Sequence, residues 1–243
     1  MLNRGLIVSC QACVNEPLYG YGIMPIMAKA AVEGGAVGIR ALYDDVDAIK
    51  KVVNVPVIGL VKRNYQNCAV YITPTEKEVD LVLATRADCL AIDATSRPRP
   101  GGIMLKDLVS YIRSKKPDVE LMADVDTLEN AIRAEEIGFD YISTTLRGYT
   151  EETRGIQLPD IDFLAEVIKR VKRSKVIAEG GIFETGELEK ISRINSGRPS
   201  DAAGPTPAGG IPMQEDECIY RRTEIIRKRR GYEYEKNCNS SAG

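Results

Sequence analysis

Short runs of aliphatic and β-branched residues alternate with stretches of helical periodicity along most of the chain. The apolar runs are typical of strands, and the amphipathic stretches between them are typical of helices. The predicted strands span residues 6–11, 36–41, 56–62, 89–95, 121–125, 141–146 and 175–181. The predicted helices span residues 23–33, 45–53, 75–85, 105–114, 127–137, 160–171 and 185–195. This alternation predicts βαβ units in a parallel sheet, and the uniformly apolar strands indicate that both faces of the sheet are covered.

The length of the chain favours one closed arrangement of these units. Its 243 residues match the ~250 typical of an α/β fold of the (β/α)₈ TIM-barrel class. We predict that residues 1–197 form units one to seven of a single barrel domain. The absence of Trp and the presence of only 3 Phe leave aliphatic residues to fill the core, which suits a barrel interior.

The eighth unit does not follow the pattern of the first seven. Residues 198–212 contain Pro205, Pro207 and Pro212 and no apolar run, so they do not fit a central strand. We therefore expect an irregular or incomplete eighth βα unit at residues 198–230, with a basic, helix-like stretch at 220–230. Residues 231–243 are expected to be a polar, disordered tail. The sequence leaves open whether the barrel closes irregularly or lacks its eighth strand.

Composition excludes several classes of function. The net charge of −2 gives no support to a nucleic-acid or anionic-membrane partner. No apolar run approaches the ~18–20 residues of a membrane helix, and the start lacks the pattern of a signal peptide, so we expect a cytoplasmic protein. There is no histidine, so any proton transfer must use Lys, Asp, Glu, Tyr or Cys.

The six cysteines give little support to a metal site. Only Cys10 and Cys13 form a C-x-x-C pair, and neither a second pair nor a histidine is present to complete four ligands. Cys10 ends an apolar run, where a small buried thiol is the usual role. We predict no metal site.

Polar residues stand at the ends of the predicted strands, where barrel enzymes carry their reactive groups. Since each follows an apolar run, we expect their side chains to converge on one mouth. Any one of them alone is equally compatible with a structural ion pair or a solvated turn. These residues are Gln11, Arg40, Lys62, Asp93, Asp124, Thr144, Thr145 and Glu179.

Lys62 and Glu179 are the candidate catalytic residues. Lys62 follows the apolar run 57–61, and burial lowers the pKa of a lysine into the range used for acid–base work. Glu179 follows residues 175–178 and would orient Lys62 or complete a proton shuttle if the two side chains meet. A buried salt bridge between them is the structural alternative.

Glycines after the seventh strand are the candidate phosphate site. Gly180 and Gly181 would let backbone N–H groups approach a phosphate, as loops after strands seven and eight do in many barrels, although a Gly-Gly turn also simply ends a strand. Arg40 fits two interpretations equally. It would clamp a phosphate or carboxylate of the substrate, or it would pair with a neighbouring aspartate.

These motifs fall in an order that resembles one family, the NanE-type N-acetylmannosamine-6-phosphate 2-epimerases. The resemblance covers residues 6 to about 197, roughly four-fifths of the chain. The strings Lys62-Arg63-Asn64-Tyr65 and Tyr71-Ile72-Thr73-Pro74-Thr75 are its most specific parts. Further matching strings are Ser9-Cys10-Gln11-Ala12, Ile39-Arg40-Ala41, Met122-Ala123-Asp124, Ser143-Thr144-Thr145-Leu146 and Ala178-Glu179-Gly180.

The resemblance implies a cofactor-free isomerase that interconverts N-acetylmannosamine 6-phosphate and N-acetylglucosamine 6-phosphate in sialic-acid catabolism, with the sugar phosphate as its partner and a homodimer as its assembly. It implies that Lys62 is the acid–base lysine and Glu179 the catalytic carboxylate. Gln11, Arg40 and Asp124 resemble sugar-binding positions, and the strand-end position of Thr145 adds it to the predicted substrate-binding set.

Two departures from the family pattern leave alternatives open. Gly181 stands where the family usually has an arginine, and the eighth strand with its glycine turn has no clean match. A different phosphate-binding barrel, such as a pentose-phosphate 3-epimerase, is one rival. A catalytically impaired, binding-only relative is the other.

Overall fold

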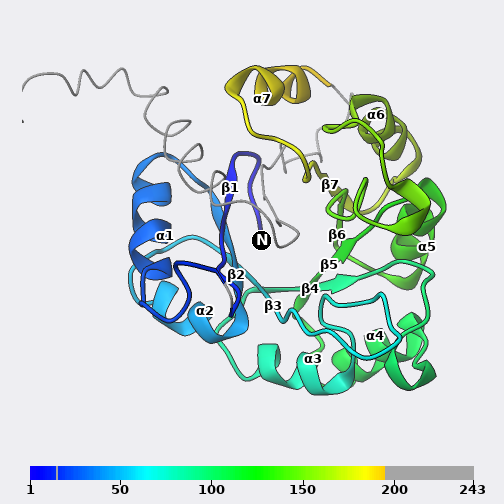
Figure 1. Ribbon diagram of the computed structural model, residues 1–243, viewed down its shortest axis with the longest axis horizontal. Helices are drawn as coiled ribbons and strands as arrows, with labels where there is room; N and C mark the ends of the chain where they lie inside the picture. Colours follow the sequence, from blue (N-terminus) through cyan, green and yellow to red (C-terminus); the bar gives the residue numbers. More distant parts are fainter. Residues whose placement is uncertain (15, 195–243) are drawn as a thin grey trace, which may run out of the picture.

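The computed structural model describes residues 1–14 and 16–194 as seven βα units around a curled parallel sheet (Figure 1). The strands follow one another in chain order from β1 to β7, and each pair is parallel. The sheet consists of β1 (Ile7–Cys10), β2 (Gly38–Leu42), β3 (Val57–Leu60), β4 (Cys89–Asp93), β5 (Glu120–Asp124), β6 (Tyr141–Ser143) and β7 (Lys175–Ile177).

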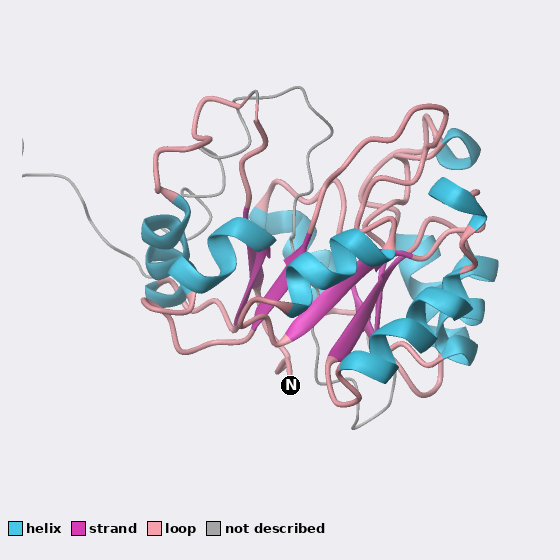
Figure 2. Ribbon diagram, turned by 90° about the horizontal axis from the view of Figure 1, so that it is seen from below, coloured by secondary structure: helices cyan, strands magenta, loops and turns pink. Residues whose placement is uncertain are grey.

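Seven α-helices lie on the outside of this curl, as Figures 1 and 2 show from two directions. A helix follows each strand, which is the order that parallel pairing requires. The helices are α1 (Met24–Glu33), α2 (Tyr43–Ile49), α3 (Glu76–Leu83), α4 (Leu105–Lys115), α5 (Leu128–Ile137), α6 (Ile161–Arg170) and α7 (Thr185–Ser192). None of the described helices is long and apolar enough to span a bilayer.

Local signals in the sequence set the bounds of several helices. Thr127 caps α5 by accepting a hydrogen bond from the Asn130 N–H, and Gly138 ends that helix with a φ of 104°. Asp160 caps α6 through the Phe163 N–H. Such caps satisfy backbone groups that have no partner within the helix.

Alternate residues of each strand face opposite sides of the sheet. One set, which includes Ile39, Leu90 and Ala123, packs with the helices in the larger hydrophobic cluster. The other set, which includes Ile58, Ala91 and Met122, forms a separate cluster inside the curl. The strands are therefore buried on both faces, which explains why they are apolar throughout.

The N-terminal segment closes one end of the interior. Leu2 is 0% exposed; its N–H donates to the Tyr141 hydroxyl at 2.9 Å and its carbonyl accepts from Lys175 Nζ at 3.2 Å. A Cβ on Gly38 would lie 2.8 Å from a Leu2 methyl, so only glycine leaves room there. The long loops lie at the opposite end (Figure 2). Among the described residues, this segment therefore covers the end of the interior opposite to the long loops.

The seven predicted strands and seven predicted helices are all present, with bounds shifted by a few residues. The largest shift concerns α2, which begins at Tyr43 rather than at residue 45 and ends at Ile49 rather than at 53. Its N-cap, Leu42, is also the last residue of β2, so no loop separates the two elements. The predictions for residues 198–230 and 231–243 lie outside the described residues.

Candidate active site

The period of two residues brings the polar strand ends into one layer of the interior. On β4 and β5, Asp93 and Asp124 are register partners, and Asp124 in turn pairs with Ser143 on β6. Two residues beyond Ser143 comes Thr145, and two beyond Ile177 of β7 comes Glu179. These side chains are all buried. On β4 to β7, the polar side chains at the strand ends therefore lie together in the interior, as the sequence predicted.

Arg40 crosses the interior from β2 to β5. Its Nη1 and Nη2 donate to the two carboxylate oxygens of Asp124 at 3.0 and 2.7 Å, and Nη1 also lies 3.5 Å from Glu179 Oε2. Only 2% of the Arg40 side chain and none of Asp124 is exposed. Burial alone would lower the pKa of Arg40, but the two carboxylates outweigh it and raise that pKa. Of the two interpretations left open above, pairing with an aspartate is the one present here.

Glu179 is held by hydroxyl groups of β6 and the residues after it. Its Oε2 accepts from Ser143 Oγ at 3.0 Å and lies 2.9 Å from Thr145 Oγ1. Its main chain is fixed by Thr144, whose hydroxyl donates to the Glu179 carbonyl at 2.8 Å and accepts from the Glu179 N–H at 2.9 Å. The second carboxylate oxygen, Oε1, is buried without a hydrogen-bond partner among the described residues.

The protonation of Glu179 follows from its surroundings. Burial raises the pKa of its carboxyl group; Arg40 opposes that rise, and the charge of Asp124 adds to it. Thr145 has one hydroxyl proton, and Asp124 Oδ1 lies closer to it, at 2.6 Å, than Glu179 does. If Asp124 accepts that proton, a protonated Glu179 can donate to Thr145 in return. Burial and the charge of Asp124 thus favour the protonated form of Glu179, whereas Arg40 and the hydroxyls of Thr145 and Ser143 favour the ionised form.

Lys62 stands two residues after the end of β3 and is half-buried. Burial lowers the pKa of its ammonium group below the ordinary 10.5; the nearby Arg40 lowers it further, while Cys13, Glu16 and Glu179 oppose the change. Within the described part of the chain, no hydrogen bond or ion pair joins Lys62 to Glu179. The buried salt bridge considered as the structural alternative is therefore not formed, and the amine remains available.

Gln11 presents an unused acceptor at the same mouth. Its Nε2 donates to Ser9 Oγ at 2.6 Å, and its Oε1 is buried without a hydrogen-bond partner in the described structure. A buried amide oxygen without a partner is costly, so a ligand hydroxyl or amide N–H would stabilise it. This is consistent with the substrate-binding role predicted for Gln11.

Tyr71, Arg97 and Ser143 lie at this mouth and were not predicted as site residues from the sequence, whereas Asp93 was predicted as a polar strand end. Asp93 accepts from Arg97 Nη2 at 2.6 Å and from the hydroxyl of Thr95 at 2.7 Å. Burial, with the nearby Asp93 and Asp124, raises the pKa of Tyr71. Ser143 could have been found, since it stands two residues before Thr145 on the same face. Tyr71 and Arg97 come from loops, whose paths the strand pattern does not predict.

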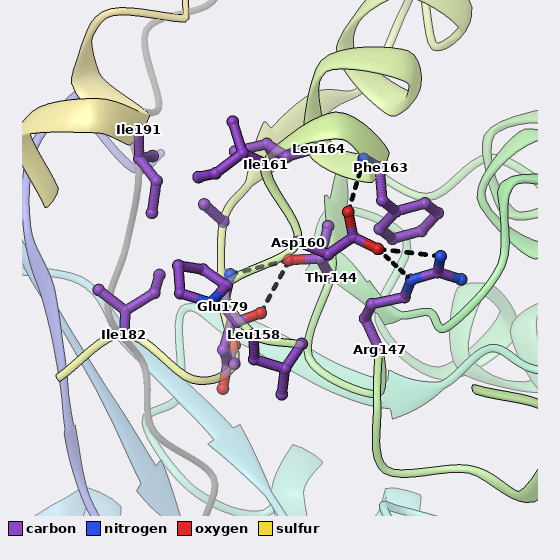
Figure 3. Close-up of a pocket in the computed structure, with 13 residues that line it drawn as sticks. Thr144, Arg147, Leu158, Asp160, Ile161, Phe163, Leu164, Glu179, Ile182 and Ile191 are labelled. Atoms are coloured by element: carbon purple, nitrogen blue, oxygen red, sulfur yellow. Dashed lines mark hydrogen bonds and ion pairs between the residues drawn. The ribbon is translucent and has the colours of Figure 1, made fainter. Parts of the chain in front are cut away.

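Gly180 and Gly181 form a turn that only glycine can occupy. Their φ values are 100° and 65°, and a Cβ on Gly181 would lie 2.2 Å from the Leu158 Cβ. The arginine of the family pattern therefore has no room at position 181 in this conformation. Gly180 also lines a small pocket between α6, α7 and the end of β7, beside the Arg147–Asp160 ion pair (Figure 3).

The described residues contain no group of three or more His, Cys, Asp or Glu side chains that could hold a metal ion. The C-x-x-C pair does not act as a unit, because Cys10 packs in the cluster against the helices and Cys13 packs against the interior cluster. Neither thiol forms a disulfide among the described residues.

Comparison with known proteins decides the family. The profile of the NanE family, described as "Putative N-acetylmannosamine-6-phosphate epimerase", matches residues 24–197. This chain belongs to that family. A protein of Staphylococcus haemolyticus named "Putative N-acetylmannosamine-6-phosphate 2-epimerase" is 51% identical over 197 residues, which cover 80% of this chain and 87% of that protein. A Staphylococcus aureus protein of the same name is 52% identical over 194 residues, covering 79% and 86%.

Solved structures agree with this assignment. The N-acetylmannosamine-6-phosphate 2-epimerase from Clostridium perfringens superposes with a TM-score of 0.80 at 42% identity, covering 93% of this chain and 94% of that one. An orotidine 5'-monophosphate decarboxylase from Methanocaldococcus jannaschii superposes with a TM-score of 0.56 at 15% identity, covering 93% and 98%, and shows the fold alone. The predicted TIM-barrel class and the family resemblance are both confirmed.

Proposed function

We propose that this member of the NanE epimerase family inverts carbon 2 of N-acetylmannosamine 6-phosphate to give N-acetylglucosamine 6-phosphate. One observation carries the proposal beyond family membership. Two ionisable groups at the same mouth have pKa values displaced toward one another, with Lys62 lowered and Glu179 raised. A base and an acid of this kind are what proton removal and return next to a carbonyl require.

The proposed reaction uses the open-chain sugar, whose carbon 2 lies beside the aldehyde. The neutral amine of Lys62 takes the proton from carbon 2, and the electron pair of the C–H bond moves into an enolate. The Arg40 charge stabilises the negative charge that develops on the enolate oxygen. Glu179, in its protonated form, gives its proton to the opposite face of carbon 2, which restores the aldehyde with inverted configuration. Exchange of protons with water then returns Lys62 and Glu179 to their starting forms.

The remaining predicted residues have binding roles in this proposal. The free oxygen of Gln11 accepts from the sugar, while Asp124 and Thr145 hold Arg40 and Glu179 in place. The backbone N–H groups of Gly180 and Gly181 are proposed to contact the phosphate. We also propose that no metal or organic cofactor takes part, that the protein acts in the cytoplasm, and that it forms a homodimer.

Incubation with N-acetylmannosamine 6-phosphate in deuterated water tests the proposal. The gluco epimer should form and should carry deuterium at carbon 2, as read by proton NMR. A parallel sample with excess chelator should react at the same rate, and ribulose 5-phosphate should not react. A folded protein that gives neither product nor exchange would be a binding-only relative, and turnover of the pentose phosphate alone would favour the rival epimerase.

A further inference from the structure

Lys62 lies at the base of a β-hairpin that leaves the barrel after β3. Lys62 forms an antiparallel bridge with Ile72, the Arg63 N–H donates to the Tyr71 carbonyl at 2.9 Å, and a second bridge joins Tyr65 to Cys68 near the tip. The two most specific strings of the sequence, 62–65 and 71–75, are thus the two arms of this hairpin. Since no hydrogen bond of the Lys62 ammonium group is present among the described residues, the hairpin backbone determines where the amine lies.

One buried carboxylate fastens the hairpin to the helix that follows. Glu78 lies in the first turn of α3 and is 0% exposed. Its Oε1 accepts from Arg63 Nη1 at 2.9 Å and from the Tyr65 hydroxyl at 3.0 Å. Its Oε2 accepts from the N–H and the hydroxyl of Thr75, at 3.1 and 2.5 Å.

The two carboxylate oxygens of Glu78 therefore bind different parts of the chain. Oε2, with Thr75, completes the capping box of α3, which is an ordinary means of starting a helix. A capping box needs nothing on the other oxygen, yet here Oε1 accepts from two side chains of the first hairpin arm. Charge-assisted hydrogen bonds to a fully buried carboxylate are among the stronger ones, so this contact restrains the arm that begins with Lys62.

We propose that Glu78, acting through Arg63 and Tyr65, is a positioning residue that keeps the Lys62 amine buried and in place for the proposed epimerisation. Without this anchor, the hairpin can move away from the barrel mouth and admit water to Lys62. The pKa of the amine then returns toward its ordinary value, and its distance from carbon 2 becomes less well defined. A misplacement of about 1 Å costs on the order of 10²-fold in rate.

The test compares an anchor variant with a cap variant. Arg63→Gln combined with Tyr65→Phe removes both donors to Oε1 and leaves Thr75 on Oε2. Thr75→Ala removes the hydroxyl contacts of the cap, keeps the N–H of residue 75 on Oε2, and leaves Arg63 and Tyr65 on Oε1. The anchor variant should lose about 10²-fold in kcat with little change in KM, and the acid limb of its pH profile should move to higher pH. The cap variant should have a lower Tm, but its kcat and the acid limb of its pH profile should be those of the wild type.

A second readout does not depend on the proposed function. The rate of acetylation of the Lys62 amine, followed by mass spectrometry against pH, reports its pKa without substrate, and this pKa should rise in the anchor variant only. A wild-type pKa and kcat in the anchor variant would overturn the proposal, as would an equal shift in the cap variant. If the double variant fails to fold, Tyr65→Phe alone gives the same comparison. Wild-type protein without exchange at carbon 2 would refute the epimerase function, while the acetylation profile would still decide the role of Glu78.

Discussion

Arg40 and Asp124 face one another across the interior of the barrel, with both Nη atoms of the guanidinium bonded to both oxygens of the carboxylate. The pair joins β2 to β5, two strands that are not neighbours in the sheet. Glu179 adds a second carboxylate 3.5 Å from the same guanidinium. The site is therefore built around a buried ion pair that also spans the fold.

Removal of one partner of this pair should be costly. Arg40→Met leaves the buried carboxyl groups of Asp124 and Glu179 without a cation. Asp124→Leu leaves the buried Arg40 guanidinium with Glu179, 3.5 Å away, as its remaining partner. Each variant should lose about 3–5 kcal/mol of unfolding free energy. The double variant should lose much less than the sum. Urea denaturation of the four proteins measures this coupling, and additive losses would show that the pair does not act as a unit.

Lys62→Ala should abolish epimerisation and leave Tm close to that of the wild type. Lys62→Arg is the matched control, because a guanidinium keeps the charge but does not become neutral in the accessible pH range, so it too should be inactive. Wild-type activity should rise with pH through the lowered pKa of Lys62, which lies below 10.5. Removal of a positioned acid–base group usually lowers the rate by about 10²–10⁴-fold. If Lys62→Ala keeps more than about a tenth of wild-type kcat, Lys62 is not the base.

Glu179→Gln should cost about 10²–10⁴-fold in kcat. It should also change how stability depends on pH. The raised pKa of Glu179 means that its contribution to stability is full below its ordinary value of 4.5 and is lost as pH rises through the folded-state pKa. The stability difference between variant and wild type should therefore move in favour of the variant as pH rises above 4.5. A difference that stays constant across this range would show that folding does not raise the pKa of Glu179.

Gly181→Ala should destabilise the fold, because the new Cβ meets Leu158 at 2.2 Å on a backbone with a φ of 65°. The expected loss is about 1–3 kcal/mol, the range for a residue held in a strained conformation. Gly186→Ala is the control: it lies in α7, and its Cβ would have no neighbour within 4 Å, so it should stabilise by about 0.4–1 kcal/mol. Calorimetry that finds equal Tm values for the two variants would contradict the close approach of Leu158.

Replacement of residues 198–220 by an apolar strand with a Gly-Gly turn should raise both Tm and affinity for the sugar phosphate. Among the described strands β1 and β7 are the outermost, and an unpaired edge of a parallel sheet is unfavourable. Thermal unfolding with and without substrate measures both effects. This prediction concerns residues outside the described structure, and an ordered eighth strand at 198–210 in the natural sequence would contradict it.

The alternation of strand residues made most of the site predictable. Lys62, Asp124, Thr145 and Glu179 were found because each follows an apolar run in a chain whose strands are parallel, and parallel strands end at the same edge. The absence of a hydrogen bond or ion pair between Lys62 and Glu179 in the described structure was not predictable, since strand order around a curled sheet gives no distance across it.

Site residues that come from loops could not be predicted from the strand pattern. The hairpin carries Tyr71 to the mouth, and the turn after β4 carries Arg97 to Asp93. Both depend on pairings between residues that no short periodicity relates. The roles of the predicted residues in catalysis and binding stay predictions until the variants above are measured.

The alternate facing of strand residues has a consequence for how the gene can change. A substitution at one codon of a strand affects one side chain on one face. The loss or gain of one codon within β7 would exchange the faces of the residues that continue this strand, turning Ala178 inward and Glu179 toward the helices. The number of residues in each strand is therefore under tighter constraint than the identity of most of them. Insertions and deletions during evolution can be accommodated only between the strands.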